Sequence, residues 1–139
     1  DGLKQIKKYQ KIILLYNEER QPEGILEGFN LFCAQYGIQN KIINTLTDRE
    51  LLKGELYIIL DDKNLIRIIK RIKDEHLTLA KDIGIISYND TLLKEIVEGG
   101  ITTISTNFNL MGERLAEMIL NSEFAQVENP NRLILRKSL

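Results

Sequence analysis

Three short runs of almost unbroken apolar residues constrain the fold of this chain more than any other feature of its sequence. They are KIILLY at 11–16, ELYIIL at 55–60 and DIGIIS at 82–87. A strand with one face in water alternates apolar and polar side chains, whereas a continuous apolar run is typical of a strand that is covered on both faces. The runs therefore predict the central strands of a parallel sheet with helices packed on both sides.

Stretches with helical periodicity separate these strands. Apolar residues recur at three- and four-residue steps in PEGILEGFNLFCAQYG at 22–37 and again in DDKNLIRIIKRIKDE at 61–75. We expect a further strand in IQNKIINTL at 38–46 and a short helix in TDRELLKG at 47–54. This alternation predicts right-handed βαβ units in a three-layer α/β/α fold with a mainly parallel sheet.

The end of the chain departs from this alternation. A strand in ITTIST follows a glycine pair, NFNLMGERLAEMILN at 107–121 has the pattern of an amphipathic helix, and NRLILRKSL predicts a final short strand. We expect one domain with three parts, namely a βα lobe at 1–100, a crossover strand and helix at 101–121, and a loop with a terminal strand at 122–139.

Composition excludes several classes of function. Lys and Arg number 19 against 20 Asp and Glu, and a net charge of −1 provides no basic surface for direct contact with nucleic acid. The one cysteine excludes an internal disulfide framework, and no Cys/His metal motif is present. No apolar run approaches the roughly 18 residues of a membrane span. We therefore expect a cytoplasmic protein with no cofactor, no metal and no membrane partner.

Polar residues follow the three apolar runs where each strand is expected to end. Because the carboxyl ends of parallel strands lie on one edge of the sheet, where open α/β sheets bind ligands, these residues predict a site. Each step can also serve only as a helix cap, and we expect this of Asp90. The three steps are Asn17-Glu18-Glu19, Asp61-Asp62 and Asn89-Asp90.

An enzyme is a weaker hypothesis for these residues. The acidic side chains on the predicted edge allow Mg²⁺ beside a phospho-accepting Asp61, as in receiver domains built on a similar sheet. Receivers, however, carry an acidic pair where this chain has Asn17-Glu18, and a lysine after the last strand that has no clear counterpart here. Cys33 on an apolar helix face is expected to pack, and His76 near a helix end to be solvated, so that no nucleophile and base are paired.

The chain resembles the effector-binding domain of LacI/GalR-type transcription regulators. In that family a strand leads to a Gly-Phe-Asp-Asp step, followed by a Leu-Thr-Thr strand and a Met-Gly helix. The counterparts here are IGIISYND, ITTIST and LMGERLAEMIL, and the ending NRLILRKSL matches the family's terminal strand with its arginine and Ser-Leu finish. Similar effector domains also occur behind winged-helix heads of the GntR type.

This resemblance implies one lobe of a type I periplasmic-binding-protein-like fold, in which the helix at 108–120 packs on a second lobe. It implies a small, sugar-like effector bound in the cleft between the lobes, a homodimer, and DNA binding through a separate head domain. A stand-alone or exported sugar-binding module shares the bilobed fold and is the alternative function.

The resemblance also implies which residues contact the effector. In the family these are an arginine on the Gly-Phe helix, an asparagine after the third strand and the first aspartate of the Phe-Asp-Asp step. Asp61 and Asn89 occupy the second and third positions, where both can accept hydrogen bonds from hydroxyl groups. Ile25 replaces the arginine and removes its bidentate donor.

Three more positions complete the predicted ligand-binding set. Arg20 and Gln21 lie just upstream of the lost arginine and are expected to substitute for it. Asn17 ends the first strand, and Phe108 is expected to offer an aromatic wall to an apolar ligand face.

Overall fold

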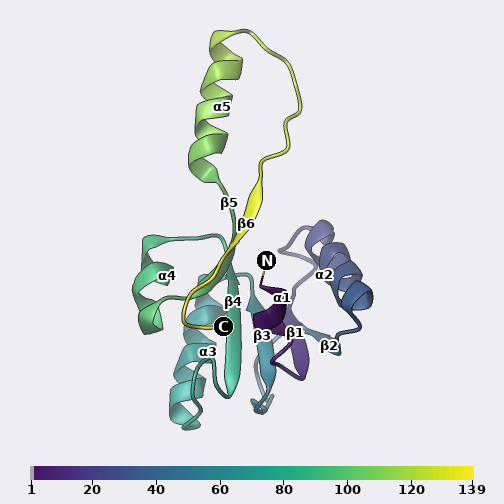
Figure 1. The fold of residues 1–139 in the computed structure, drawn as a ribbon, viewed down its shortest axis with the longest axis vertical. Coiled ribbons are helices and arrows are strands. Elements are labelled where there is room, and N and C mark those ends of the chain that lie inside the picture. The colour runs from purple at the N-terminus through teal and green to yellow at the C-terminus, as the bar shows by residue number, and fades with distance from the viewer. Residues whose placement is uncertain (1) are drawn as a thin grey trace.

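The computed structural model describes residues 2–139 and has a six-stranded sheet at its centre (Figure 1). The strand order is β2-β1-β3-β4-β5-β6, with the first five strands parallel and β6 antiparallel to β5. The strands are β1 (Lys11–Leu15), β2 (Asn40–Ile43), β3 (Glu55–Ile59), β4 (Ile83–Tyr88), β5 (Thr102–Thr106) and β6 (Asn131–Ile134). The helices are α1 (Leu3–Ile6), α2 (Glu23–Tyr36), α3 (Asp62–Asp74), α4 (Leu92–Ile96) with the 3-10 turn η1 (Val97–Gly99), and α5 (Phe108–Leu120).

The three apolar runs form the neighbouring strands β1, β3 and β4, as predicted. Ile13, Tyr57 and Ile85 lie side by side in register across these strands, and each is fully buried. Residues of both parities along each run are buried, because helices cover both faces of the sheet.

Two layers of helix enclose the sheet. On one face α3 packs through Leu65 and Ile68, and on the other face α2 packs through Phe29 and Cys33, with α1 beside it. The predicted three-layer fold with a mainly parallel sheet is therefore confirmed. The packing role predicted for Cys33 is confirmed as well, since its side chain is buried within that second cluster.

Local signals set the ends of the two long helices. Gly37 ends α2 with a φ of 62°, a left-handed conformation that glycine adopts without steric cost. Asp61 begins α3, because its carboxylate accepts a hydrogen bond from the backbone N–H of Asn64 at 2.9 Å. The carboxyl end of β3 is thus joined directly to the first turn of a helix.

The short helix predicted at 47–54 is wrong, because this segment forms turns. Asp48 has a φ of 56° and Gly54 a φ of 86°, and both interrupt helical geometry. The segment must return from the carboxyl end of β2 to the amino end of β3. A helix advances only about 1.5 Å per residue, so an extended path covers this distance with fewer residues.

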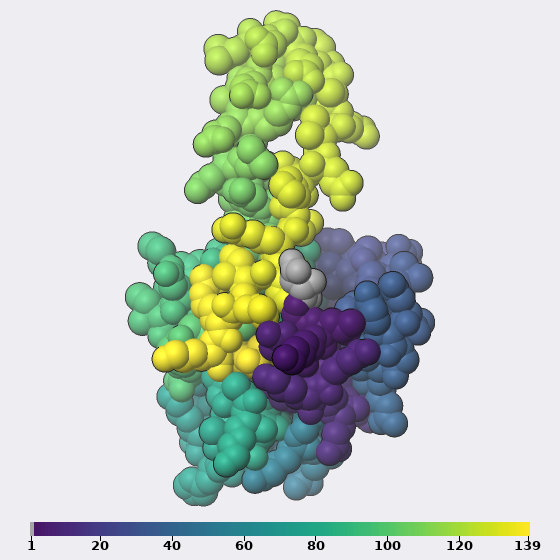
Figure 2. All heavy atoms as spheres, in the orientation of Figure 1, coloured from purple at the N-terminus to yellow at the C-terminus, as the bar shows by residue number. Residues whose placement is uncertain are grey.

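An arm leaves the body after β5 (Figure 1). Helix α5 projects beyond the carboxyl edge of the sheet, and residues 121–130 return from its far end to β6. None of the described residues of α5 is buried, and Figure 2 shows the arm standing clear of the body. Its large apolar side chains are consequently exposed: Phe108, Leu110, Met111, Leu115, Ile119 and Leu120.

Candidate functional site

Asn17, Asp61 and Asn89 follow the ends of three adjacent strands at equivalent positions. Leu15, Ile59 and Ser87 are paired in register across β1, β3 and β4. Each polar residue follows its member of this trio by two positions along the chain. These three of the predicted site residues therefore form one row just past the carboxyl ends of their strands. Figure 1 shows that the arm rises from this edge of the sheet.

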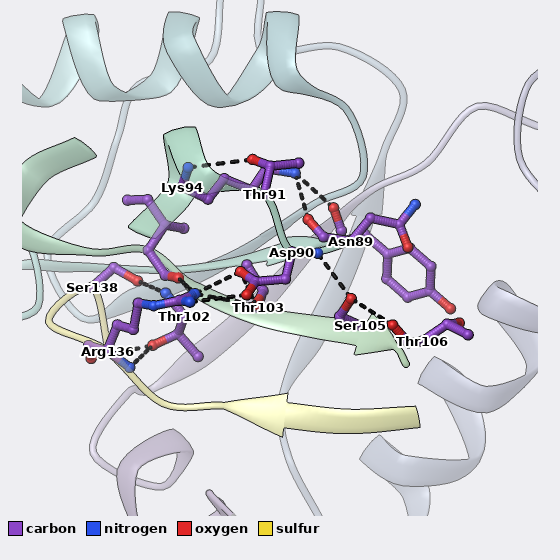
Figure 3. A network of polar contacts seen from close by, with 12 residues as sticks. Asn89, Asp90, Thr91, Lys94, Thr102, Thr103, Ser105, Thr106, Arg136 and Ser138 are labelled. Atoms are coloured by element: carbon purple, nitrogen blue, oxygen red, sulfur yellow. Dashed lines mark hydrogen bonds and ion pairs between the residues drawn. The ribbon is translucent and has the colours of Figure 1, made fainter. Parts of the chain in front are cut away.

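Asn89 presents a free side chain from an unusual backbone conformation. Its φ is 60°, in the left-handed region that asparagine tolerates better than most residues. Its backbone N–H donates to the carbonyl oxygen of Ile104 at 2.8 Å, which ties the end of β4 to β5. The side chain is exposed, and in Figure 3 its amide points away from Arg136. This amide can both donate to and accept from a ligand.

Asp61 is committed to the helix that follows it. Its Oδ1 accepts from the backbone N–H of Asn64 at 2.9 Å, and its Oδ2 accepts from the side-chain amide of Asn64 at 2.8 Å. Carboxylate oxygens have further lone pairs, so capping and ligand contact are compatible. The cap is shown, and contact with a ligand stays a prediction.

A tight turn orders the residues after β1. The side-chain oxygen of Asn17 accepts from the backbone N–H of Glu19, and the side-chain oxygen of Gln21 accepts from the backbone N–H of Asn17. Both side-chain oxygens are thus engaged within the turn. Arg20 projects from this turn with an exposed side chain, next to the row.

The two hydrophobic positions behave differently. Ile25, at the position of the expected arginine, is half-buried and packs against the core beneath α2. Phe108 begins α5 and is 47% exposed at the base of the arm. Its ring is therefore available to a ligand or to another protein surface.

The prediction that Asp90 caps the next helix is wrong. Thr91 caps α4, because its hydroxyl oxygen accepts from the backbone N–H of Lys94. Asp90 instead forms a bidentate ion pair with Arg136, with Nη1–Oδ1 at 2.6 Å and Nη2–Oδ2 at 2.9 Å, and also accepts from the Thr103 hydroxyl (Figure 3). These hydrogen bonds from Arg136 hold the pKa of the Asp90 carboxyl below its usual value.

Arg136 and Lys94 contact residues next to Asn89 and at Asn89 itself, and sequence reasoning did not single them out. Arg136 had a signal, since it is the arginine of the terminal strand in the family pattern. Lys94 had none, because nothing in TLLKEI separates a buried lysine from a solvated one. Its side chain is only 4% exposed, and its Nζ lies beneath the end of β4.

Two open hollows flank other parts of the body. One is lined by Asn17, strand β2 and the loop after it, and the other by residues 48–53 and the end of α3. Asp61 and Asn89 line neither of these two hollows. Of the three residues in the row, Asn17 alone lines one of these two hollows.

Two features are absent from residues 2–139. Within this range no three or more His, Cys, Asp or Glu side chains are arranged to hold a metal ion. In the same part of the chain no helix combines the length and the apolar character needed to cross a membrane.

Residues 6–139 match the family described as periplasmic binding protein-like domain. No curated protein sequence matches the chain. Among solved structures, a probable maltose operon transcriptional repressor from Staphylococcus aureus superposes with a TM-score of 0.73 at 19% identity, over 98% of this chain and 55% of that one.

Two other solved structures have the same fold. A periplasmic binding protein/LacI transcriptional regulator from Alkaliphilus metalliredigens, in complex with D-xylulofuranose, gives a TM-score of 0.74 at 16% identity, over 97% of this chain and 59% of that one. A dimeric Lac repressor with a C-terminal deletion gives 0.70 at 19% identity, over 94% and 55%. The chain thus spans little more than half the length of these structures. The family match and the superpositions confirm the prediction of a periplasmic-binding-protein-like fold.

Proposed function

The chain belongs to the family of periplasmic binding protein-like domains, and on that basis we propose that it is the ligand-sensing part of a transcription regulator. It supplies one wall of a cleft for a small, sugar-like molecule. Binding of that molecule in the cytoplasm controls a separate head domain, which contacts DNA. The net charge of −1 agrees with that division of labour, because direct contact with DNA is typical of domains with an excess of basic residues.

One observation carries this proposal: the row of Asn17, Asp61 and Asn89 at the carboxyl edge of the sheet. Amides and a carboxylate in one row offer donors and acceptors at the spacing of adjacent strands, which suits a ligand with several hydroxyl groups. Phe108 adds an exposed ring against which the apolar face of a sugar can pack.

The exposed arm is an argument that a second lobe forms the other wall of the cleft. Helix α5 rises from the same edge of the sheet and exposes apolar side chains such as Leu115 and Ile119, at 57% and 70%. Exposed surface of this kind marks a contact with another protein surface. A second lobe packed on α5 would stand opposite the row of polar residues and would enclose the ligand. Ligand binding would then favour one arrangement of the two lobes.

Self-association has a candidate surface on the opposite side from α2. Helices α3 and α4 lie on one face of the body. The ion pair Lys94–Asp62 links α4 to α3, and Lys73–Glu98 links the turn η1 to α3. The outer surface of the two helices carries large apolar side chains in solvent: Ile66, Leu92, Leu93 and Ile96, with exposures of 52%, 80%, 56% and 76%. A homodimer formed through this apolar α3–α4 surface would bury them and would present two heads to a two-fold operator.

Titration of the natural protein with sugars tests the ligand-binding function. Maltose, D-xylulose and other mono- and disaccharides are added in turn, and binding is measured by calorimetry. Asn89→Asp keeps a residue that tolerates the left-handed backbone but removes the amide donor. We expect at least one sugar to bind, and this variant to weaken binding by about tenfold or more.

The matched control is Asn30→Asp, the same change at an exposed position of α2. It is expected to leave binding unchanged. The absence of binding by every sugar in the panel, or equal losses in both variants, would contradict a sugar site at this edge.

The size of the natural protein tests the second lobe. An antibody raised against this 16.1 kDa chain should detect a cellular species of more than twice that mass. A species of 16 kDa would leave a stand-alone binding module as the function.

Sedimentation of the natural protein tests the dimer. Leu92→Asp places a charge in the apolar α3–α4 surface and should shift the protein from dimer to monomer. Leu31→Asp changes a leucine of similar exposure, 72%, on α2 and should leave the dimer intact. A dimer that persists in the first variant, or dissociates in both, would exclude this surface as the interface.

A further inference from the structure

We propose that Lys94 is a positioning residue of the ligand site, which holds the main chain on both sides of Asn89 so that the Asn89 amide faces the cleft. The inference rests on the proposed function, because it assigns a role to Lys94 at that same site. It is carried by three contacts of the Lys94 ammonium group and by two hydrogen bonds on the other side of the chain.

The ammonium group of Lys94 joins three segments. Its Nζ donates to the carbonyl oxygens of Tyr88 at 2.7 Å and Asn89 at 2.9 Å, and lies 2.9 Å from Oδ1 of Asp62 at the start of α3. Lys94 and Asn89 are labelled in Figure 3. An ammonium group has three N–H donors, and each has a partner here. With a side chain only 4% exposed, Lys94 is not available to contact a ligand itself.

These contacts fix the two peptide groups that flank the Asn89 Cα. The Tyr88 carbonyl belongs to the peptide plane that defines φ of Asn89, and the Asn89 carbonyl belongs to the plane that defines its ψ. One cation that binds both oxygens therefore restrains both dihedral angles. A carbonyl and the N–H of the same planar trans peptide point in opposite directions, so Lys94 holds only one side of each plane.

Strand β5 holds the other side. The N–H of Asn89 donates to the carbonyl oxygen of Ile104 at 2.8 Å, and the N–H of Asp90 donates to the hydroxyl of Ser105 at 2.9 Å. Both peptide groups are thus bound at both ends, between Lys94 and β5. The left-handed φ of 60° at Asn89 is imposed by this frame, and the side chain is the one part of the residue left to turn toward solvent.

The bridge to Asp62 extends the frame to the next strand. Asp62 follows Asp61, so the same ammonium group links the two ligand-site positions at the ends of β3 and β4. A buried lysine costs desolvation energy unless it is fully paired. An apolar side chain would be enough if this position served only for packing. Binding two carbonyl oxygens and a carboxylate at once requires a cation.

Hydrogen exchange measured by NMR tests the frame without any ligand. In Lys94→Met, which keeps the length of the side chain but removes its donors, the Asn89 amide should exchange at least about tenfold faster, with the β4 amides of Ile85 and Ile86 unchanged. Lys73→Met is the matched control, because it removes the other ion pair between α3 and the segment after α4, at a residue whose side chain is 61% exposed. It should leave Asn89 unaffected.

Unchanged exchange at Asn89 in Lys94→Met would overturn the proposal, as would equal acceleration in Lys73→Met or throughout the sheet. If Lys94→Met does not fold, Asp62→Ala carries the same test, since it removes one of the three partners and should speed Asn89 exchange by a smaller factor.

A double-mutant cycle for sugar binding separates positioning from general stability. In the natural protein Lys94→Met should weaken sugar binding at least as much as Asn89→Asp, and should add little in the Asn89→Asp background, because both act through one amide. Fully additive losses would overturn the role. If no sugar binds even the unchanged protein, the proposed function fails, while the exchange experiment still decides whether Lys94 holds Asn89.

Discussion

Arg136 donates two hydrogen bonds to the carboxylate of Asp90, at 2.6 and 2.9 Å, although the two residues are 46 positions apart in the sequence. Asp90 follows the end of β4, and Arg136 follows β6, the strand that returns from the arm. The pair is well shielded, with side-chain exposures of 26% and 16%. It therefore fastens the returning chain to the body at the place where the arm emerges.

Removal of this carboxylate should destabilise the fold. Asp90→Asn leaves the Arg136 guanidinium without its charged partner, and we expect the free energy of unfolding to fall by about 2 kcal/mol. Asp74→Asn, at the exposed end of α3, is the control and should change it by less than about 0.5 kcal/mol. Urea denaturation of the two variants measures both values, and equal losses would show that the ion pair contributes nothing specific.

The same pair predicts a dependence of stability on acid. Hydrogen bonds from Arg136 lower the pKa of Asp90 in the folded state, so the folded protein holds the ionised form more strongly than the unfolded chain does. This contribution is complete above the unfolded pKa of about 4 and is lost as the pH falls through the lower folded pKa. The stability difference between the unchanged protein and Asp90→Asn should therefore be constant near neutral pH and shrink below about pH 4. A difference that stays constant to pH 2 would contradict the assignment.

The central sheet was predictable because its signal is local. Each of the three central strands β1, β3 and β4 is an almost continuous apolar run that ends in a polar step, so the sequence alone places Asn17, Asp61 and Asn89 on one edge. The structure adds the strand register, in which Leu15, Ile59 and Ser87 are paired, so that each polar residue follows its strand at the same distance from that trio; no local pattern specifies this.

The roles of neighbouring polar residues were not predictable in the same way. Asp90 and Thr91 are both good helix caps by residue type, and the distant Arg136 decides between them by taking the carboxylate. Lys94 looks like any surface lysine, and its burial depends on Asp62 and on two backbone carbonyls. At 47–54 the composition suits a helix, but the distance between the ends of β2 and β3 requires an extended path. Contacts made far along the chain determined each of these outcomes.

Cys33 should be chemically silent in the folded protein. Cys33 lies on the buried face of α2 and is 1% exposed. Burial raises the pKa of its thiol, so little reactive thiolate is present near neutral pH. We expect a disulfide reagent such as dithionitrobenzoate to label it only as fast as the protein unfolds. Ala34→Cys in a Cys33→Ala background moves the thiol to the next residue, which is exposed on the same helix, and should react at once. Rapid labelling of the unchanged protein would show that α2 opens locally.

The loss of an apolar side chain should lower the free energy of unfolding strongly in helix α3 and very little in helix α5. Ile68 in α3 is fully buried, and Ile68→Ala should cost about 2–5 kcal/mol of unfolding free energy, because it removes apolar contacts and leaves a cavity. Leu115 in α5 is 57% exposed, and in this chain Leu115→Ala should change stability by no more than about 0.5 kcal/mol.

In the natural protein a second lobe packed on α5 would bury Leu115, and the same substitution should then cost at least about 2 kcal/mol. Denaturation of both forms measures the difference, and a Leu115→Ala change that is neutral in both would mean that this face of the arm stays in solvent.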